Sequence, residues 1–202
     1  MIASDTRHRL VRAAEQLFRT QGYSGTGLKE LTAAAAAPWG SLYHFFPGGK
    51  AELAAEAMLW AGGAYGQGWR RAFAQAAGPG EAIEGVFRAE ARILEGSDYR
   101  NGCPVAAMTL DIASTDERLR RACAEAFRGW LDILVEGFAA HGADAEAAEA
   151  MANFVLATIE GAIVLSRAAK SPGPLHACGR LVRDAVDAEA EGWSKLEVRA
   201  GG

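Results

Sequence analysis

Alanine is far more abundant in this chain than the residues that favour β-sheets. The 202 residues include 44 alanines, whereas valine, isoleucine and threonine together number only 23. Alanine loses no side-chain entropy in a helix, while β-branched side chains fit a pleated sheet. This ratio argues against a β-sandwich, a barrel or a large parallel sheet. Because half of the residues are hydrophobic, the sequence predicts a folded all-α protein with a sizeable core, as one large domain or two small ones.

The N-terminal segment has the pattern of an amphipathic helix. Its apolar residues between Leu10 and Phe18 recur at i, i+3, i+4 and i+7, and Ser4 is a suitable starting residue. Gly22 is placed to end this helix in the left-handed conformation.

Two shorter helices are expected next, joined by a tight turn. Thr26 is the predicted N-cap of the first, over residues 27–35, and Pro38 opens the second, over residues 38–45. Because proline disfavours the α conformation in the residue before it, the first of these helices ends by about Ala36. Three helices in fewer than 50 residues predict a helix-turn-helix, whose third helix enters the major groove of DNA.

Longer helices are expected beyond residue 50, separated by segments rich in glycine, proline and serine. Four glycines between 62 and 68 weaken the prediction that the first of them is continuous. The expected helices cover about 51–77, 81–94, 103–113, 116–141, 144–169 and 175–192. About nine helices and no strand are predicted in all.

The net charge of −4 is unevenly distributed. Residues 1–50 hold six Lys or Arg against three acids, and the remaining residues hold 15 against 22. A basic N-terminal segment on an acidic body is suited to binding a polyanion locally, although a charge of +3 is by itself an ordinary value.

Other classes of protein are disfavoured. The apolar stretch from Met151 to Leu165 is too short and too polar to span a bilayer, and the N-terminus has no secretion signal. Three cysteines without a CxxC pair support neither a disulfide framework nor a metal site. No nucleotide-binding, zinc-protease or other catalytic motif is present, so we expect a cytoplasmic protein with no catalytic residues, metal or cofactor.

The segment YSGTGLKELTAAAAAPWGSLYHFFPGGKAEL, residues 23–53, resembles the DNA-binding head of TetR-family transcriptional repressors. The most specific part is the run from Gly40 to Phe46 followed by Lys50. The run from Phe46 to Lys50, together with the later Asn-Gly-Cys-Pro at 101–104, is similar to the LmrA/YxaF-like subgroup. The resemblance implies a DNA-binding domain over 1–50 and a helical domain for ligand binding and dimerisation over 51–202.

The resemblance also implies which residues contact DNA. They lie at the start of the second helix and along the third: Thr26, Gly27, Lys29, Pro38, Trp39, Gly40, Ser41, Tyr43, His44 and Lys50. Glycine would let the backbone approach DNA closely, and the hydroxyl and imidazole groups are short donors. Lys50 has the alternative interpretation of an ordinary solvated helix start, and a catalytic Ser41–His44 pair lacks an orienting acid nearby in sequence.

Two positions depart from the family pattern. Ala36 stands in the turn where glycine is usual, and a left-handed alanine would cost about 1 kcal/mol. Trp39 replaces a common Lys or Arg, so a phosphate-binding cation is lost. We expect an altered sequence preference or a weaker electrostatic affinity, with a shallow dependence on salt.

The body is expected to bind an apolar or aromatic effector among its large side chains and to form a homodimer. The predicted ligand-binding residues are Trp60, Trp69, Phe73, Cys103, Met108, Phe127, Trp130, Leu134 and Phe154. The predicted dimer residues are Met151, Val155, Ala162, Leu181, Val182 and Val186, with packing inside one chain as the alternative. Cys103 is interpreted as a redox sensor or, preferably, a small buried hydrophobe.

The sequence therefore predicts a ligand-responsive repressor that binds a palindromic DNA operator as a homodimer, without a membrane partner. The alternative is a helical small-molecule-binding protein or enzyme that has lost DNA binding. The unusual Ala36 and Trp39 keep that alternative open.

Overall fold

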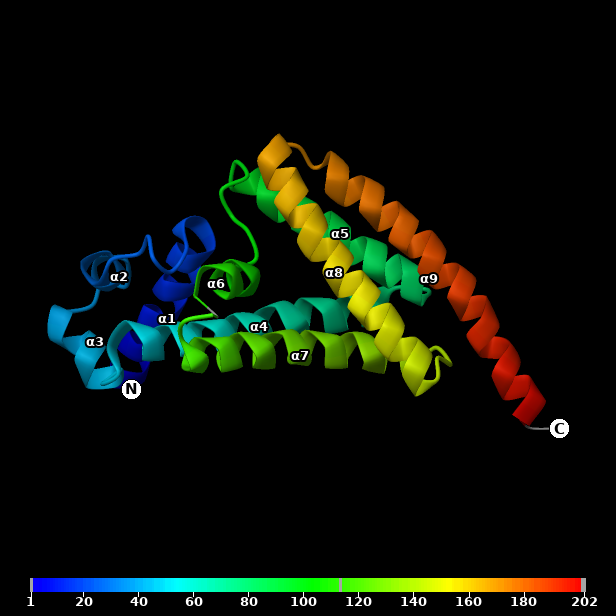
Figure 1. The fold of residues 1–202 in the computed structure, drawn as a ribbon, viewed down its shortest axis with the longest axis horizontal. Helices are drawn as coiled ribbons and strands as arrows, with labels where there is room; N and C mark the ends of the chain where they lie inside the picture. Colours follow the sequence, from blue (N-terminus) through cyan, green and yellow to red (C-terminus); the bar gives the residue numbers. More distant parts are fainter. Residues whose placement is uncertain (1, 113, 201–202) are drawn as a thin grey trace. The chain divides into compact units, whose positions relative to one another are not determined.

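A computed structural model describes residues 2–112 and 114–200, and within them the side chains of 5–112 and 114–193. The described residues form nine α-helices and no strand, which confirms the predicted all-α fold (Figure 1). The helices are α1 (Ile2–Gln21), α2 (Leu28–Ala34), α3 (Trp39–Phe45), α4 (Gly49–Gln75), α5 (Pro79–Gly96), α6 (Pro104–Ile112), α7 (Glu117–Ala139), α8 (Ala145–Ala169) and α9 (Gly173–Ala200).

The chain divides into two compact units. The first comprises Met1–Ala64 and Gly102–Arg128, and the second comprises Tyr65–Asn101 and Gly129–Gly202. The first unit extends past residue 50 because α6 packs against α1 and α4 continues through the boundary. A functional division at residue 50 stays a prediction.

The hydrophobic core of the first unit stabilises its two short helices. Leu10 and Phe18 of α1 are buried together with Leu31 of α2 and Leu42 of α3, and Phe46 closes the end of α3. Burying an apolar side chain of this size contributes roughly 1.5–3 kcal/mol. This shared core holds helices of seven residues that would be unstable in isolation.

Only one of the two ends of α1 lies where the sequence predicted it. Gly22 ends it with a φ of +76°, as predicted. The start is wrong by two residues, since the helix already begins at Ile2, before Ser4. Helix boundaries commonly shift by this much because the first turn has few internal hydrogen bonds.

Helix α4 runs unbroken through its glycines. A Cβ on Gly62 would lie 3.1 Å from the Cβ of Ala126, and one on Gly66 would lie 2.7 Å from Cδ1 of Ile133. These two glycines therefore allow α7 to approach α4 closely in each unit. The close packing offsets the intrinsic cost of glycine in a helix, about 1 kcal/mol each.

The second unit is built mainly from α5, α8 and α9, which pack side by side (Figure 1). Asp144 caps α8 by accepting the amide N–H of Ala147 at 2.9 Å, which confirms the predicted start. At the other end Lys170 takes a φ of +46°, and the chain turns directly into α9. The buried Ser166 stabilises this turn by accepting the Leu175 amide at 3.3 Å.

Helix α8 is the one helix of the described segments that is long and apolar enough to cross a membrane. The sequence predicted no membrane span because the apolar stretch Met151–Leu165 is short and contains polar residues. Helix α8 has 25 residues and extends well beyond that stretch. Length and composition alone are a weak indication, because core helices of soluble proteins have the same properties. The buried side of α8 packs against α5 and α9.

Candidate nucleic-acid interface

The turn between α2 and α3 contains a strained alanine. Ala36 has a φ of +46°, so this position does need the left-handed conformation in which glycine is usual. Two backbone hydrogen bonds fix the turn: Ala36 N–H donates to Ala33 at 3.0 Å, and Ala37 N–H donates to Thr32 at 2.9 Å. The predicted departure from the family pattern is therefore a real backbone strain.

Helix α3 exposes two aromatic side chains. Leu42 is 1% exposed and anchors the inner side, whereas Trp39 and Tyr43 are each 48% exposed on the outer side. Their ring centroids lie 6.3 Å apart, edge to face. Indole and phenol combine an apolar surface with a polar tip, which suits contact with base edges and phosphates.

The other residues predicted on α3 surround this aromatic pair. Pro38, Gly40 and His44 are exposed, and Ser41 is half-buried. A Cβ on Gly40 would meet no atom within 4 Å, so nothing in this chain requires glycine there. A glycine at such an open site is consistent with close approach of another molecule.

Thr26 does not cap α2, contrary to the sequence prediction. The N-cap is Gly27, without a side-chain capping bond, and Thr26 is 2% exposed. The Thr26 hydroxyl donates to the Gly22 carbonyl at 2.7 Å because the loop folds back on the end of α1. A side-chain contact from Thr26 to phosphate would therefore need this loop to rearrange.

Lys50 is directed toward the protein. Its Nζ donates to the Tyr23 carbonyl at 2.5 Å and lies 4.1 Å from the centroid of the Tyr23 ring. Burial lowers the pKa of Lys50, and the nearby Asp111 acts in the opposite direction. The predicted phosphate contact of Lys50 stays a prediction, but in this structure the ammonium already has a partner.

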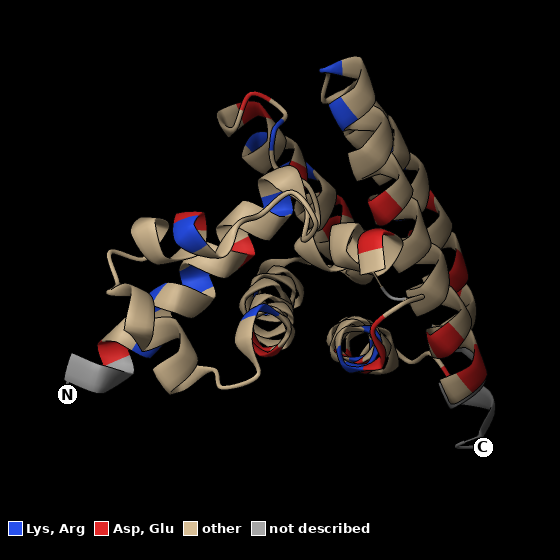
Figure 2. Cartoon of the chain, turned by 60° about the vertical axis from the view of Figure 1, so that its left-hand side comes forward, with Lys and Arg blue, Asp and Glu red and all other residues tan. Residues whose placement is uncertain are grey.

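Figure 2 marks the charged residues along the chain, and three of the six Lys and Arg in residues 1–50 form ion pairs within the first unit. Arg7 pairs with Glu56, and two arginines pair within α1, with Asp5 at 3.4 Å and Glu15 at 3.8 Å. The exposed Lys29 forms no ion pair with any residue that the structure describes. Helix α3 itself carries no Lys or Arg. Its exposed surface is therefore mainly aromatic and has no basic Lys or Arg side chain to attract phosphate.

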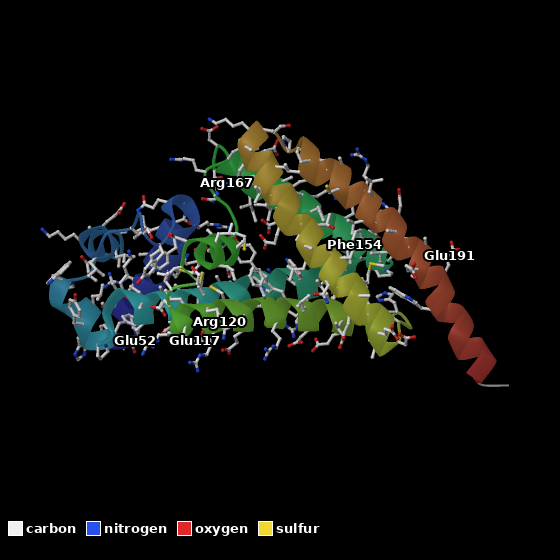
Figure 3. All side chains as sticks on the ribbon, viewed as in Figure 1. Glu52, Glu117, Arg120, Phe154, Arg167 and Glu191 are labelled. Carbon is white, nitrogen blue, oxygen red and sulfur yellow. The ribbon has the colours of Figure 1, made fainter. Side chains whose placement is uncertain are left out.

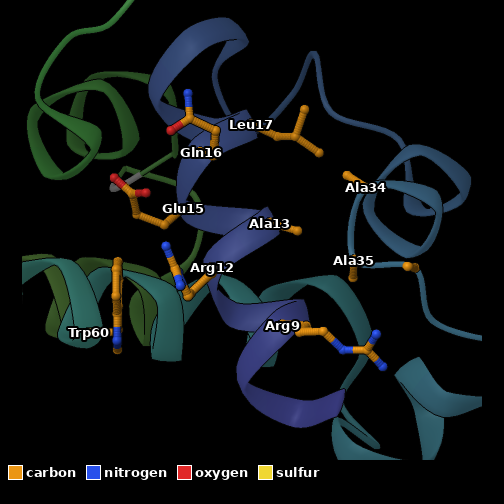
Figure 4. A pocket seen from close by; sticks show the side chains of 10 residues that line it. Arg9, Arg12, Ala13, Glu15, Gln16, Leu17, Ala34, Ala35 and Trp60 are labelled. Carbon is orange, nitrogen blue, oxygen red and sulfur yellow. The ribbon is translucent and has the colours of Figure 1, made fainter. Parts of the chain in front are cut away.

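An open groove of about 500 Å³ runs across α1 in the first unit (Figure 4). Arg12 and Trp60 lie on one side of α1, while Ala34 lies on the other side. The Arg12 guanidinium is 6.0 Å from the Trp60 ring. Trp60 thus lines a surface groove and is not enclosed among the other predicted ligand-binding residues.

The predicted ligand-binding residues are divided between the units. Trp60, Cys103, Met108 and Phe127 belong to the first unit, and the other five belong to the second. In the second unit Trp69 and Trp130 form a pair, with ring centroids 5.8 Å apart. The structure therefore brings only part of this set together.

Phe154 does not line the interior of its unit. It is 46% exposed on α8 (Figure 3), and its contact with a ligand stays a prediction. Cys103 is buried, and its Sγ accepts the Ala106 amide at 3.4 Å near the start of α6. No cluster of metal-ligating side chains occurs among the described residues.

Four of the six residues predicted for the dimer interface are buried inside the second unit. Val155, Ala162, Val182 and Val186 are at most 2% exposed because they pack within the second unit, as the alternative stated. Met151 is half-buried. Leu181 is the member of the predicted set that remains clearly exposed, at 69%.

An apolar face nevertheless remains on the outside of these helices. We call it the α8–α9 face. Its exposed large side chains are Phe154, Val164, Leu165 and Leu181. On α8 the spacing of 154, 161, 165 and 168 follows one helical stripe, with small residues between the large ones.

Sequence reasoning missed a polar contact to the loop that precedes α2. Asp111 of α6 accepts the amide of Ser24 at 2.8 Å and its hydroxyl at 2.9 Å. The two residues are 87 positions apart, and nothing in the local sequence of either indicated the contact.

The fold and this interface define a helix-turn-helix DNA-binding regulator with a second, helical unit. Residues 10–57 match the model of bacterial regulatory proteins of the tetR family, and residues 79–181 match the C-terminal domain of LmrA/YxaF-like transcriptional regulators. The chain belongs to the TetR family of transcriptional regulators and carries the LmrA/YxaF-like type of C-terminal domain.

Individual relatives agree with this assignment. The regulator LmrA of Bacillus subtilis is 34% identical over 87% of this chain and 93% of its own length. The regulator YxaF of the same organism, described as uncharacterized, is 33% identical over 85% of this chain and 90% of its own length. Reduced Escherichia coli NemR has the same fold, with a TM-score of 0.78 at 22% identity over 89% of this chain and 96% of that one.

Proposed function

We propose that this chain is a ligand-responsive repressor that binds a palindromic operator as a homodimer and leaves the DNA when a small molecule binds. The observation that carries the proposal is the exposed aromatic face of α3, where Trp39 and Tyr43 stand outward from a helix held by Leu42. A helix presented in this way can enter the major groove, and its side chains can reach base edges.

The α8–α9 face supports the homodimer. Phe154, Val164, Leu165 and Leu181 are large apolar side chains that stay exposed to water on α8 and α9, and covering them in a dimer would be favourable. Two copies joined by a two-fold axis would bury the same surface on each, with four helices at the seam. The two reading helices would then be related by the same axis, which is why we propose a palindromic operator.

The effector site is proposed in the second unit. The Trp69–Trp130 pair is extended by Tyr65, whose ring centroid lies 5.9 Å from that of Trp130, and this cluster suits an apolar or aromatic molecule. A ligand that binds one state of the dimer more tightly than the other shifts the population of DNA-competent molecules. We propose regulation in the cytoplasm and no catalytic role.

The alternative of a binding protein without DNA activity rests on two observations. Ala36 keeps a strained turn, and no cation lies on α3 to attract phosphate. A protein that had lost DNA binding would tolerate both features.

Selection from a pool of randomised DNA duplexes distinguishes the two functions. The repressor should enrich an inverted repeat, and one or more compounds from a panel of aromatic molecules should release the selected duplex. If no sequence is enriched while aromatic compounds still bind, the protein is a ligand-binding protein and the repressor function is refuted.

A further inference from the structure

Asp111 lies on α6, outside the helix-turn-helix, yet it holds the loop that leads into α2. Its Oδ2 accepts the Ser24 amide at 2.8 Å, and its Oδ1 accepts the Ser24 hydroxyl at 2.9 Å. We call this pair of bonds the Asp111–Ser24 clasp. The bond from the Ser24 amide, followed by that from its hydroxyl, lowers the pKa of Asp111, since both favour the ionised carboxylate.

A second helix binds the same loop through the opposite charge. Lys50 of α4 donates to the Tyr23 carbonyl, which also accepts the Thr26 amide at 3.1 Å. The neighbouring residues Tyr23 and Ser24 are thus held by a cation from α4 and an anion from α6. Because Thr26 is buried immediately before the N-cap of α2, the loop has little freedom to change the direction of that helix.

The start of α6 is attached to the first unit as well. Arg19 of α1 donates through Nε to the Gly102 carbonyl at 3.0 Å, and the same guanidinium pairs with the buried Glu15. Helix α6 is therefore anchored to α1 near its start and to the α1–α2 loop near its end. The chain enters this anchored helix directly from Asn101, which belongs to the second unit.

We propose that Asp111 is a positioning residue for DNA binding, which acts through the Asp111–Ser24 clasp and never touches DNA. The clasp sets the start of α2, and through the core shared with Leu31 and Leu42 it sets the orientation of α3. This inference rests on the proposed function and adds to it a residue outside the helix-turn-helix. The clasp persists at neutral pH and is lost as the pH falls through the lowered pKa of Asp111.

The test compares Asp111→Asn with Glu125→Gln, which removes the same charge from an exposed position on α7 of the same unit. Amide hydrogen exchange of residues 22–31 is measured on the free, full-length protein. Fluorescence anisotropy then gives the affinity for the duplex selected by the wild type, at several salt concentrations. Two variants of the other residue of the clasp repeat the test: Ser24→Ala removes the hydroxyl, and Ser24→Thr keeps it.

We expect Asp111→Asn and Ser24→Ala each to speed exchange in residues 22–31 and to lower the affinity for the duplex about tenfold, as loss of orientation weakens every contact of α3. The slope of affinity against salt should not change, because no phosphate contact is removed. Ser24→Thr keeps the hydroxyl and should restore the wild-type values. Glu125→Gln should match the wild type.

Each other result overturns the inference at a different point. Unchanged exchange in both Asp111→Asn and Ser24→Ala shows that the clasp does not hold the loop. Faster exchange with wild-type affinity shows that the loop does not position α3, and an altered salt slope shows that Asp111 acts through its charge on DNA. If the wild type binds no duplex, the proposed function and the positioning role fail together, while the exchange data still report on the clasp. Should Asp111→Asn fail to fold, the exposed Ser24 supplies the same comparison.

Discussion

The α3 surface and the α8–α9 face both expose large apolar side chains, and they differ in chemistry. The α3 surface presents Trp39 and Tyr43, each with a polar tip, on a helix of seven residues. The α8–α9 face presents Phe154, Leu165 and similar groups along two helices of 25 and 28 residues. Aromatic groups with hydrogen-bonding tips suit a groove edge that is both polar and apolar, whereas a long stripe of side chains without polar groups suits another copy of itself.

The two surfaces are also expected to depend on each other. The α3 surface has no Lys or Arg, and the arginines of α1 mostly pair with acids. Weak electrostatic attraction leaves a single head with low affinity, so joining two heads matters more here than in a strongly basic protein.

The largest effect is expected from breaking the α8–α9 face. Leu181→Glu places a charge on a residue that is 69% exposed, so it should leave the fold of the chain intact and separate the dimer. The affinity for the selected duplex should fall about 100-fold, because the two heads no longer bind together. Sedimentation velocity gives the oligomeric state, and Leu110→Glu, at an 84% exposed leucine of α6, should remain dimeric. A dimeric Leu181→Glu protein would show that this face is not the seam.

Truncating the aromatic pair comes next. Trp39→Ala and Tyr43→Ala should each weaken binding of the duplex about tenfold, with an unchanged melting temperature because both rings are half exposed. Anisotropy titrations and thermal unfolding measure the two quantities. Leu59→Ala, at an exposed leucine of α4, serves as the control. Wild-type affinity in both aromatic variants would show that the exposed face of α3 does not contact the duplex.

The strained turn behind α3 should change stability with a predictable sign. Ala36→Gly relieves the positive φ and should raise the free energy of unfolding by about 1 kcal/mol. Ala34→Gly, two residues earlier in α2, should lower it by roughly 0.5–1 kcal/mol because glycine is a poor helix former. Denaturant unfolding compares the two. An equal decrease in the free energy of unfolding in both variants would contradict a left-handed conformation at Ala36.

The smallest effect concerns charge. Lys29→Met should reduce the slope of log affinity against log salt by about 0.9, the value for one lost phosphate contact. Lys50→Met should leave that slope unchanged, since its ammonium binds the Tyr23 carbonyl. A reduced slope for Lys50→Met would instead support the phosphate contact that the sequence predicted.

The sequence predicted best what depends on nearby residues. Helical spacing indicated that Leu42 lies inside and Tyr43 outside, and it left Phe46 as a core or interface residue. The proline after the alanine run located the turn at Ala36. The TetR-family assignment was likewise recognisable from the order of residues 23–53, and the comparisons confirm it. These features follow from periodicity and backbone geometry within one short segment.

Tertiary packing decided the rest. The sequence predicted a dimer contact for Val155 and a ligand contact for its neighbour Phe154. Helix α8 is apolar on two sides, and its packing against α5 and α9 leaves Val155 buried and Phe154 exposed. Thr26 was a suitable N-cap by residue type, but the loop turned its hydroxyl to Gly22. Asp111 meets Ser24 only because α6 packs beside α1, and neither local pattern encodes that contact.

One titration tests the central claim most directly. The wild-type protein is added to its selected duplex and to a duplex of the same composition in scrambled order, at physiological salt, with anisotropy and stoichiometry recorded together. We expect two chains per selected duplex and an affinity on the order of 10³-fold above that for the scrambled one. Equal affinity for the two duplexes, or one chain bound per duplex, would contradict a dimer that reads a palindrome through α3.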